Sequence, residues 1–131
     1  MLLYLPRAMT PAQHKSKASH NEAFVASINL STSPFLDWAA TGVFYAGLHY
    51  IRALASANSF SNVTTYAQLD RLFVSLAPLK RRPDLYVHYR FLKDESREAR
   101  YGSRPFKPRA ISMMLTKELL PIKTYVLSLV P

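Results

Sequence analysis

Arginine and tyrosine side chains that could contact phosphate lie close together near the middle of the C-terminal half. Arg97 and Tyr101 are four residues apart, so on a helix they share one face, with Arg100 and Arg104 nearby. Guanidinium groups bind phosphate through paired hydrogen bonds, which favours a phosphate- or nucleotide-binding cluster. The alternative is structural: Asp37, at the start of another helix, pairs with Arg97 and ties two helices together. The two roles are compatible.

The segment around these residues is strongly basic. Seventeen Lys and Arg oppose eight Asp and Glu in the 131-residue chain, a formal net charge of +9. Ten of the seventeen lie between Lys80 and Arg109 against four acidic residues, so this window carries +6. Such a charge attracts nucleic acid or another polyanion without reading its sequence. A solvated helix face with a basic loop is the alternative. We predict a binding surface over residues 90–109, which includes Arg90.

The sequence shows no pattern for a metal or a cofactor. It has no cysteine, only three glycines and no glycine-rich phosphate loop. Its four histidines, at positions 14, 20, 49 and 88, include no pair at the four-residue spacing that puts two metal ligands on one helix face. We therefore predict neither metal nor cofactor. His49 lies among aromatic residues, where a hydrogen-bonded core histidine is more common than a catalytic base.

Apolar spacing predicts helices and no strands. A flexible arm is expected over residues 1–19, which show no periodicity, followed by one helical domain over residues 20–131. Helices are expected from about 20 to 30, 34 to 57, 65 to 77, 83 to 101 and 111 to 129. The predicted fold is an all-α, four- to five-helix up-and-down bundle.

Individual residues predict where these helices begin and end. Ser33 is a candidate N-cap with Pro34 at the first helical position, and Thr64 or Thr65 can cap the next helix. Gly102 is expected to end its helix in the left-handed conformation. Pro121 should kink or split the last helix, because its ring removes a backbone donor.

The segment Asp37–Ile51 is apolar on every side of a helical wheel and contains no Lys, Arg or Glu. Such a helix must be enclosed by other helices or by lipid. Its uncharged run is shorter than the roughly 18 to 20 residues that a membrane span needs. We predict a central helix sheltered by its neighbours, with no membrane association. The opening residues Met1–Leu5 are too short for a secretory signal, so a cytoplasmic location is expected.

Two of these segments resemble the HEPN domain family, whose name refers to nucleotide binding in higher eukaryotes and prokaryotes. The resemblance rests on the Asp-Trp-Ala…Phe-Tyr-Ala…Leu-His pattern of residues 37–49 and on Ser-Arg-Glu-Ala-Arg-Tyr at 96–101, and it covers about residues 20–129. It implies a helical bundle that is often dimeric. Many members are metal-independent ribonucleases of toxin–antitoxin, abortive-infection or CRISPR systems. Others bind nucleotides or act as non-catalytic partners, often beside a nucleotidyltransferase.

Catalytic members of the family carry an Arg followed four to six residues later by a His. The Arg stabilises charge on the scissile phosphate while the His moves the proton of the RNA 2′-hydroxyl. Arg97 occupies the matching place, but positions 101 to 104 are Tyr, Gly, Ser and Arg. Tyrosine has a reference pKa of about 10 and is a poor base at neutral pH.

We therefore expect a non-catalytic binding module that dimerises and contacts RNA, a nucleotide or a partner protein. The alternative is a divergent ribonuclease, in which Arg97 acts with Tyr101 or with a histidine such as His49 or His88. Arg82 precedes His88 at the family's spacing, but both lie at the other end of their helix. A surface pair unrelated to catalysis is the favoured interpretation there.

Overall fold

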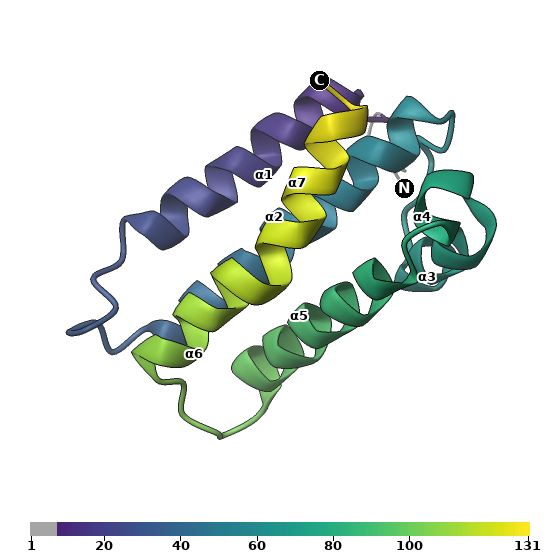
Figure 1. Ribbon diagram of the computed structural model, residues 1–131. Helices are drawn as coiled ribbons and strands as arrows, with labels where there is room; N and C mark the ends of the chain where they lie inside the picture. The colour runs from purple at the N-terminus through teal and green to yellow at the C-terminus, as the bar shows by residue number, and fades with distance from the viewer. Residues whose placement is uncertain (1–7) are drawn as a thin grey trace, which may run out of the picture.

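The computed structural model describes residues 8–131, and the part of the predicted arm that falls on residues 1–7 lies outside it. The described residues form helices and no strands (Figure 1). Long segments run alternately up and down: α1 (Pro11–Ala26), α2 (Leu36–Ala57), α5 (Pro83–Tyr101), and the continuous run of α6 (Pro108–Met113), η1 (Met114–Leu119) and α7 (Leu120–Leu129). The short helices α3 (Tyr66–Ser75) and α4 (Ala77–Lys80) lie at one end. The predicted all-α bundle is confirmed.

Helix α1 begins at Pro11, so the prediction of a flexible arm is wrong for residues 11–19. Thr10 caps it: the Thr10 hydroxyl accepts from the Gln13 backbone N–H at 3.1 Å, and the Gln13 side chain accepts from the Thr10 N–H at 2.9 Å. Its buried positions include His14 and Ala18. A histidine and an alanine add little to an apolar pattern, which is why periodicity did not reveal this helix.

Polar contacts hold α1 against the rest of the bundle. The Glu22 carboxylate accepts a hydrogen bond from the hydroxyl of Tyr50 on α2 and another, at 2.9 Å, from the Lys123 ammonium on α7. The Lys15 ammonium donates to the backbone oxygen of Pro131 at 2.8 Å. Glu22 thus joins three helices through one side chain.

Helix α2 is the sheltered centre of the bundle, as predicted. Its buried residues run from Leu36 to Ala55 and cover most of the helix, whereas the less buried Trp38, Tyr45, His49 and Arg52 lie along one side. No helix within residues 8–131 combines the length and the apolar character needed to span a bilayer. Its start differs from the prediction by two residues. Phe35 is the N-cap, and the Ser33 hydroxyl accepts from the Phe35 backbone N–H at 3.0 Å, so it turns the chain ahead of the helix.

Glycine lets α1 approach α2 closely. A Cβ built on Gly42 would lie 2.8 Å from a Val25 methyl carbon, which is closer than real Cβ atoms come. A Cβ on Gly47 would lie 3.1 Å from the flexible end of the Leu92 side chain.

We expect Gly42→Ala to destabilise the fold although alanine is the better helix former. The gain in helix propensity is about 1 kcal/mol, whereas overpacking a tight core costs about 1 to 3 kcal/mol. Gly47→Ala is the matched control and should be close to neutral, because Leu92 can move aside. Urea unfolding of the two variants measures the difference. A Gly42→Ala variant as stable as Gly47→Ala would show that α1 and α2 do not pack this closely.

The remaining helix boundaries follow the sequence in part. Thr65 caps α3 through a capping box with Gln68, and Pro83 opens α5, both as predicted. Pro121 neither breaks nor separates the last helix, because α6, η1 and α7 follow one another without a gap. The wider π-helical segment η1 ends two residues before Pro121, at the place where the proline ring would crowd the preceding turn of an α-helix.

Candidate functional site

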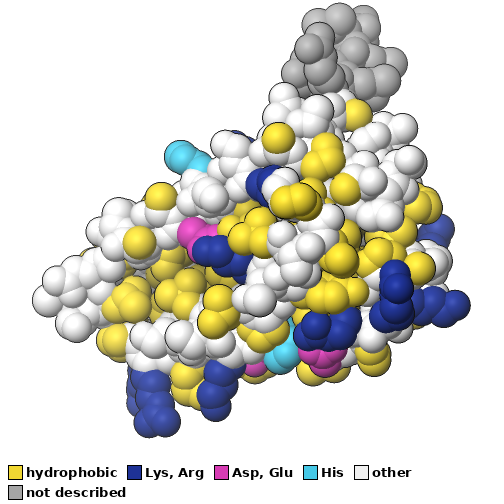
Figure 2. Space-filling view, turned by 45° about the horizontal axis from the view of Figure 1, so that its top comes forward, with side chains coloured by type: hydrophobic (Ala, Val, Ile, Leu, Met, Phe, Trp, Pro, Cys, Tyr) yellow, Lys and Arg dark blue, Asp and Glu magenta, His cyan; other side chains and the backbone are white. Residues whose placement is uncertain are grey.

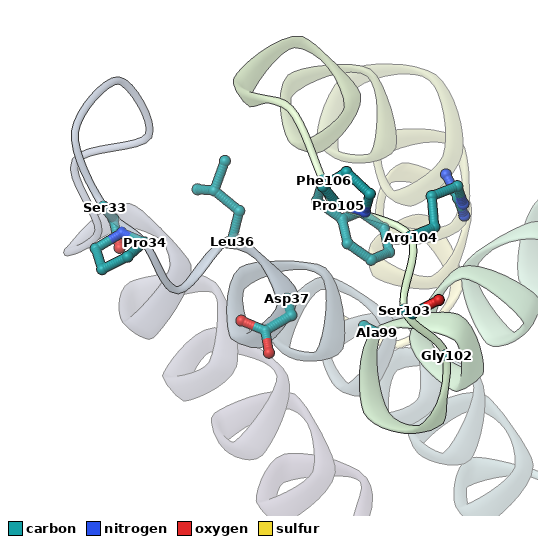
Figure 3. Close-up of a pocket in the computed structure, with 10 residues that line it drawn as sticks. All are labelled: Ser33, Pro34, Leu36, Asp37, Ala99, Gly102, Ser103, Arg104, Pro105 and Phe106. Carbon is teal, nitrogen blue, oxygen red and sulfur yellow. The ribbon is translucent and has the colours of Figure 1, made fainter.

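Two adjoining hollows lie where the start of α2 meets the end of α5. The larger, of about 350 Å³, extends from Ser33 and Pro34 to the linker between α5 and α6, where Arg104, Pro105 and Phe106 lie across from them (Figure 3). The smaller, of about 290 Å³, lies beside it. It is lined by Asp37, Trp38, Thr41, Ala99, Arg100 and Tyr101. Since Asp37 and Ala99 line both hollows, we treat them as one site, the α2–α5 end site.

Arg100, rather than Arg97, faces α2 in this site. Tyr89, Leu92 and Ser96 are fully buried and mark the inner face of α5. Arg100 lies one turn beyond Ser96 on that face. Arg97 is rotated about the helix axis by about 100° from Ser96 and is exposed.

The predicted structural pair between Asp37 and Arg97 is therefore wrong. No ion pair joins these two side chains among residues 8–131, where every salt bridge involves other residues. Asp37 lines both hollows instead, and the exposed Arg97 guanidinium is left to a ligand or to solvent.

Contacts across the helix interface hold Arg100 in place. Its Nη1 donates to the hydroxyl of Tyr45 on α2 at 3.1 Å, and its Nε donates to the Ser96 carbonyl at 3.2 Å. Its guanidinium carbon lies 5.8 Å from the centre of the Tyr45 ring and 5.3 Å from that of Tyr101. Burial raises the pKa of Tyr45, and the nearby Tyr66 adds to this, while the Arg100 charge opposes it. Tyr45 therefore stays neutral and accepts the bond from Arg100.

Carboxylates of α5 shape the linker that carries Arg104. The Arg104 guanidinium forms an ion pair with Glu95, and its backbone N–H donates to the Glu98 carboxylate at 3.0 Å. A Cβ on Gly102 would lie 2.2 Å from a Glu98 carboxylate oxygen. Gly102 has a φ of −93°, so the predicted left-handed conformation is wrong. Glycine leaves room for the Glu98 side chain to fold over the backbone, and a larger residue would push the Glu98 carboxylate aside.

Two aromatic side chains at the site face solvent. Trp38 is 55% exposed and Tyr101 is 81% exposed, and both line the smaller hollow together with Arg100. The prediction that the whole of residues 37–51 is sheltered is therefore wrong at Trp38. Because α2 is apolar on every side, its sequence does not indicate which side its neighbours leave uncovered. Exposed rings beside a guanidinium are suited to stacking on unpaired bases.

The predicted basic surface over residues 90–109 is divided into parts. Arg90 lies ten residues before Arg100, about 15 Å along α5, and its Nη1 donates to the Tyr86 hydroxyl at 3.0 Å. In the window from Lys80 to Arg109, carboxylates pair with Arg82, Lys93 and Arg104. Figure 2 shows Lys and Arg side chains in separate groups, with hydrophobic and acidic side chains between them, on the face in view. Arg90 is thus not part of the α2–α5 end site.

His49 pairs with a histidine that sequence reasoning did not connect to it. Its Nδ1 lies 3.1 Å from the Nδ1 of His14 on α1, so one ring donates and the other accepts. Burial lowers the pKa of His14 to about 4, and the Arg52 charge adds to this. Burial likewise lowers the pKa of His49 to about 4, with smaller contributions from His14, Arg52 and Lys17. His49 makes no hydrogen bond with Arg97.

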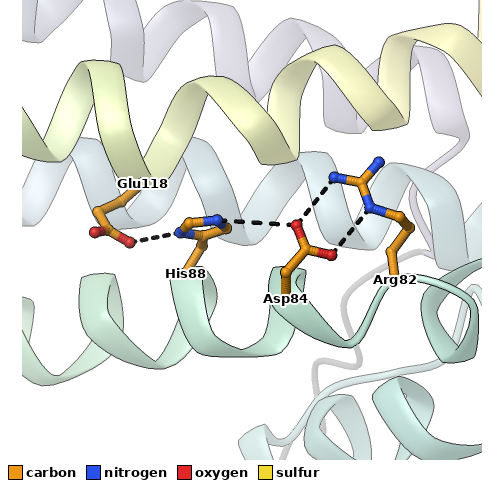
Figure 4. A network of polar contacts seen from close by, with 4 residues as sticks. All are labelled: Arg82, Asp84, His88 and Glu118. Carbon is orange, nitrogen blue, oxygen red and sulfur yellow. Dashed lines mark hydrogen bonds and ion pairs between the residues drawn. The ribbon is translucent and has the colours of Figure 1, made fainter.

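His88 belongs to a chain of polar contacts on the other half of α5 (Figure 4). Both Arg82 nitrogens, Nε and Nη2, donate to Asp84 at 3.0 Å, and the Arg82 contact lowers the pKa of Asp84. His88 lies with Nε2 4.0 Å from Asp84 and Nδ1 2.8 Å from Glu118 on η1. Arg82 and His88 thus lie on either side of Asp84, and the contact between His88 and Glu118 joins α5 to η1. Sequence reasoning paired them by spacing, but Glu118, thirty residues further on, could be placed only by the fold.

Within residues 8–131 no group of three His, Cys, Asp or Glu side chains could hold a metal ion. The chain matches no protein-family model, no curated protein and no solved structure.

Proposed function

We propose that this chain is a non-catalytic, HEPN-like module that binds single-stranded RNA at the α2–α5 end site. The observation that carries the proposal is the gathering of Arg100, Trp38 and Tyr101 around one hollow, with Arg104 on the adjoining linker and the exposed Arg97 one turn before Tyr101 on α5. Arginines contact the phosphates and exposed rings stack on bases, which must be unpaired to be reached. The net charge of +9 favours a polyanionic partner.

Binding without cleavage follows from the proton chemistry. Cleavage through the 2′-hydroxyl needs a proton acceptor beside the Arg that stabilises the phosphate. Among residues 8–131, His14 engages His49 and Glu118 engages His88, and no hydrogen bond links a histidine to Arg97. The divergent ribonuclease remains the alternative. A homodimer that brings a partner histidine to Arg97, a nucleotidyltransferase partner and a cytoplasmic toxin–antitoxin role stay predictions from the family resemblance.

We expect Arg97→Ala to weaken binding of a labelled single-stranded RNA about fivefold, and to leave the RNA uncut in both proteins. Loss of one phosphate contact should also lower the slope of log affinity against log salt by about 0.7. Fluorescence polarisation at several salt concentrations and a gel of the recovered RNA measure both effects. Arg71→Ala is the matched control, because Arg71 is an exposed arginine on α3, away from the site. Cleavage that disappears in Arg97→Ala would refute the binding module in favour of the ribonuclease.

A further inference from the structure

A second, smaller hollow lies near the opposite end of α2. It measures about 100 Å³ and lies between the start of α1, the later turns of α2 and the loop that follows α2. Its polar lining comes from His14, Arg52, Ser61, Asn62 and Thr64. Arg52 is fifteen residues after Asp37, which places it about 22 Å along α2 from the α2–α5 end site. The two sites are therefore separate.

The positive charge of Arg52 in this hollow has no ion-pair partner among residues 8–131. The Arg52 Nε is buried and makes no hydrogen bond within that part of the chain. A buried guanidinium nitrogen without a partner is costly, and such groups are normally satisfied by a partner or a ligand. The Arg52 charge also acts on both His14 and His49, whose pKa values it helps to lower.

His14 offers a second donor to the same hollow. Its side chain is 5% exposed, and its Nδ1 is engaged by His49. Its Nε2 makes no hydrogen bond with any residue from Ala8 to Pro131, although His14 lines the hollow. When His49 donates its Nδ1 proton to His14, the neutral His14 ring carries its own proton on Nε2. That arrangement presents an N–H beside the Arg52 guanidinium.

The hollow has a positive electrostatic environment and a small volume. Helix α1 starts at Pro11 beside the hollow with no acidic residue in its first turn, so no carboxylate of that turn balances the positive end of its dipole. The adjoining wall at Met9 is held by the Ser56 hydroxyl, which donates to the Met9 carbonyl at 2.9 Å. Pockets for drug-sized molecules measure about 300 to 1,000 Å³, so a hollow of this size accepts a group of only a few atoms.

We propose that Arg52 and His14 bind a phosphate group in this hollow, as inorganic phosphate or as a terminal phosphate monoester. The guanidinium donates to two phosphate oxygens, the His14 Nε2–H donates to a third, and the Ser61 hydroxyl and Asn62 amide close the outer side. The bound anion supplies the partner that Arg52 lacks. It also fixes the direction of the hydrogen bond between the two histidines, with His49 as the donor.

Titration of inorganic phosphate into the full chain tests this site. Isothermal calorimetry at neutral pH and constant ionic strength should show saturable binding. The NMR signals of the His14 ring should shift as phosphate is added, and the shifts should give the same dissociation constant. Arg52→Gln should weaken binding by about tenfold or more, since it removes a charge-assisted donor pair. Arg71→Gln, the matched control, should bind as the native chain does, and so should Trp38→Ala/Tyr101→Ala.

The arms of the experiment separate the sources of the phosphate and keep the proposal refutable. If ribose 5-phosphate displaces inorganic phosphate, the site accepts a phosphate monoester. If ribose 5-phosphate does not displace it, the site accepts only the free ion. If Arg52→Gln does not fold, as judged by circular dichroism, His14→Gln provides the same comparison. Absence of saturable phosphate binding, or equal binding by the native chain and the folded variant, would overturn the site. RNA binding at the other end could still stand.

Discussion

Replacing both exposed rings of the α2–α5 end site, in Trp38→Ala/Tyr101→Ala, should weaken binding of single-stranded RNA about a hundredfold. Stacking of one base on an aromatic side chain is worth about 1 to 3 kcal/mol by alanine substitution, so two rings together account for this loss. The rings are 55% and 81% exposed, so neither belongs to the buried core. The variant should therefore unfold at nearly the native urea concentration. Fluorescence polarisation with a labelled RNA measures the affinity.

The slope of this affinity against salt separates stacking from charge. Because the arginines remain, the slope of log affinity against log salt should stay close to the native value, unlike the slope of Arg97→Ala. Phe91→Ala is the matched control, since Phe91 is a 45% exposed ring on α5 that lines neither hollow. Native affinity in the double variant would place the RNA elsewhere on the molecule. An equal loss for double-stranded RNA would argue against recognition of unpaired bases.

Acidification should destabilise the fold through the His14–His49 pair. The pKa of each ring is lowered from 6.5 to about 4 in the fold, first by burial and then by nearby positive charge. Between these values the unfolded chain binds more protons than the folded chain, so the free energy of unfolding falls as the pH falls. The contribution of the two neutral histidines to the free energy of unfolding is fully present above pH 6.5 and is lost by about pH 4. One histidine shifted this far corresponds to about 3 kcal/mol, and repulsion between two protonated rings would add to the loss.

Urea unfolding between pH 7 and pH 5 isolates this effect, because carboxylates change charge mainly below that range. His49→Gln should flatten the dependence of stability on pH, since it removes one of the two shifted groups. His20→Gln, a replacement of an exposed histidine on the same helix as His14, should keep the native dependence. Native and His49→Gln proteins with the same pH dependence would contradict the assignment.

Several features of the fold were predictable because they depend on local chemistry. Thr65 with Gln68, and Pro83 at a first helical turn, mark helix starts through contacts within four residues of chain. Gly102 ends its helix as predicted but for another reason, the close approach of Glu98. The start of α1 was missed because His14 and Ala18 form its buried face, and neither contributes a strong apolar signal.

The candidate site was predictable only in outline. Composition and spacing placed Arg97, Arg100, Tyr101 and Arg104 near one helix end, and the structure brings the last three to hollows that adjoin α2. Arg90 was included by its position in a basic window, although about 15 Å of helix separates it from Arg100. Net charge indicates an affinity for polyanions but does not tell which cations are already paired with carboxylates.

The sequence by itself determined that the chain is helical, that α2 is enclosed and that the second half is basic, because helical period, burial and charge are properties of a segment. Only the tertiary structure decided that Trp38 is uncovered, that Arg100 meets Tyr45, and that Arg52 shares a hollow with His14. The two pairings join residues 55 and 38 positions apart, and the sequence of α2 is apolar on every side. The sequence of α2 therefore sets no preferred rotation of the helix about its axis. Which side of α2 stays exposed depends on how the neighbouring helices pack.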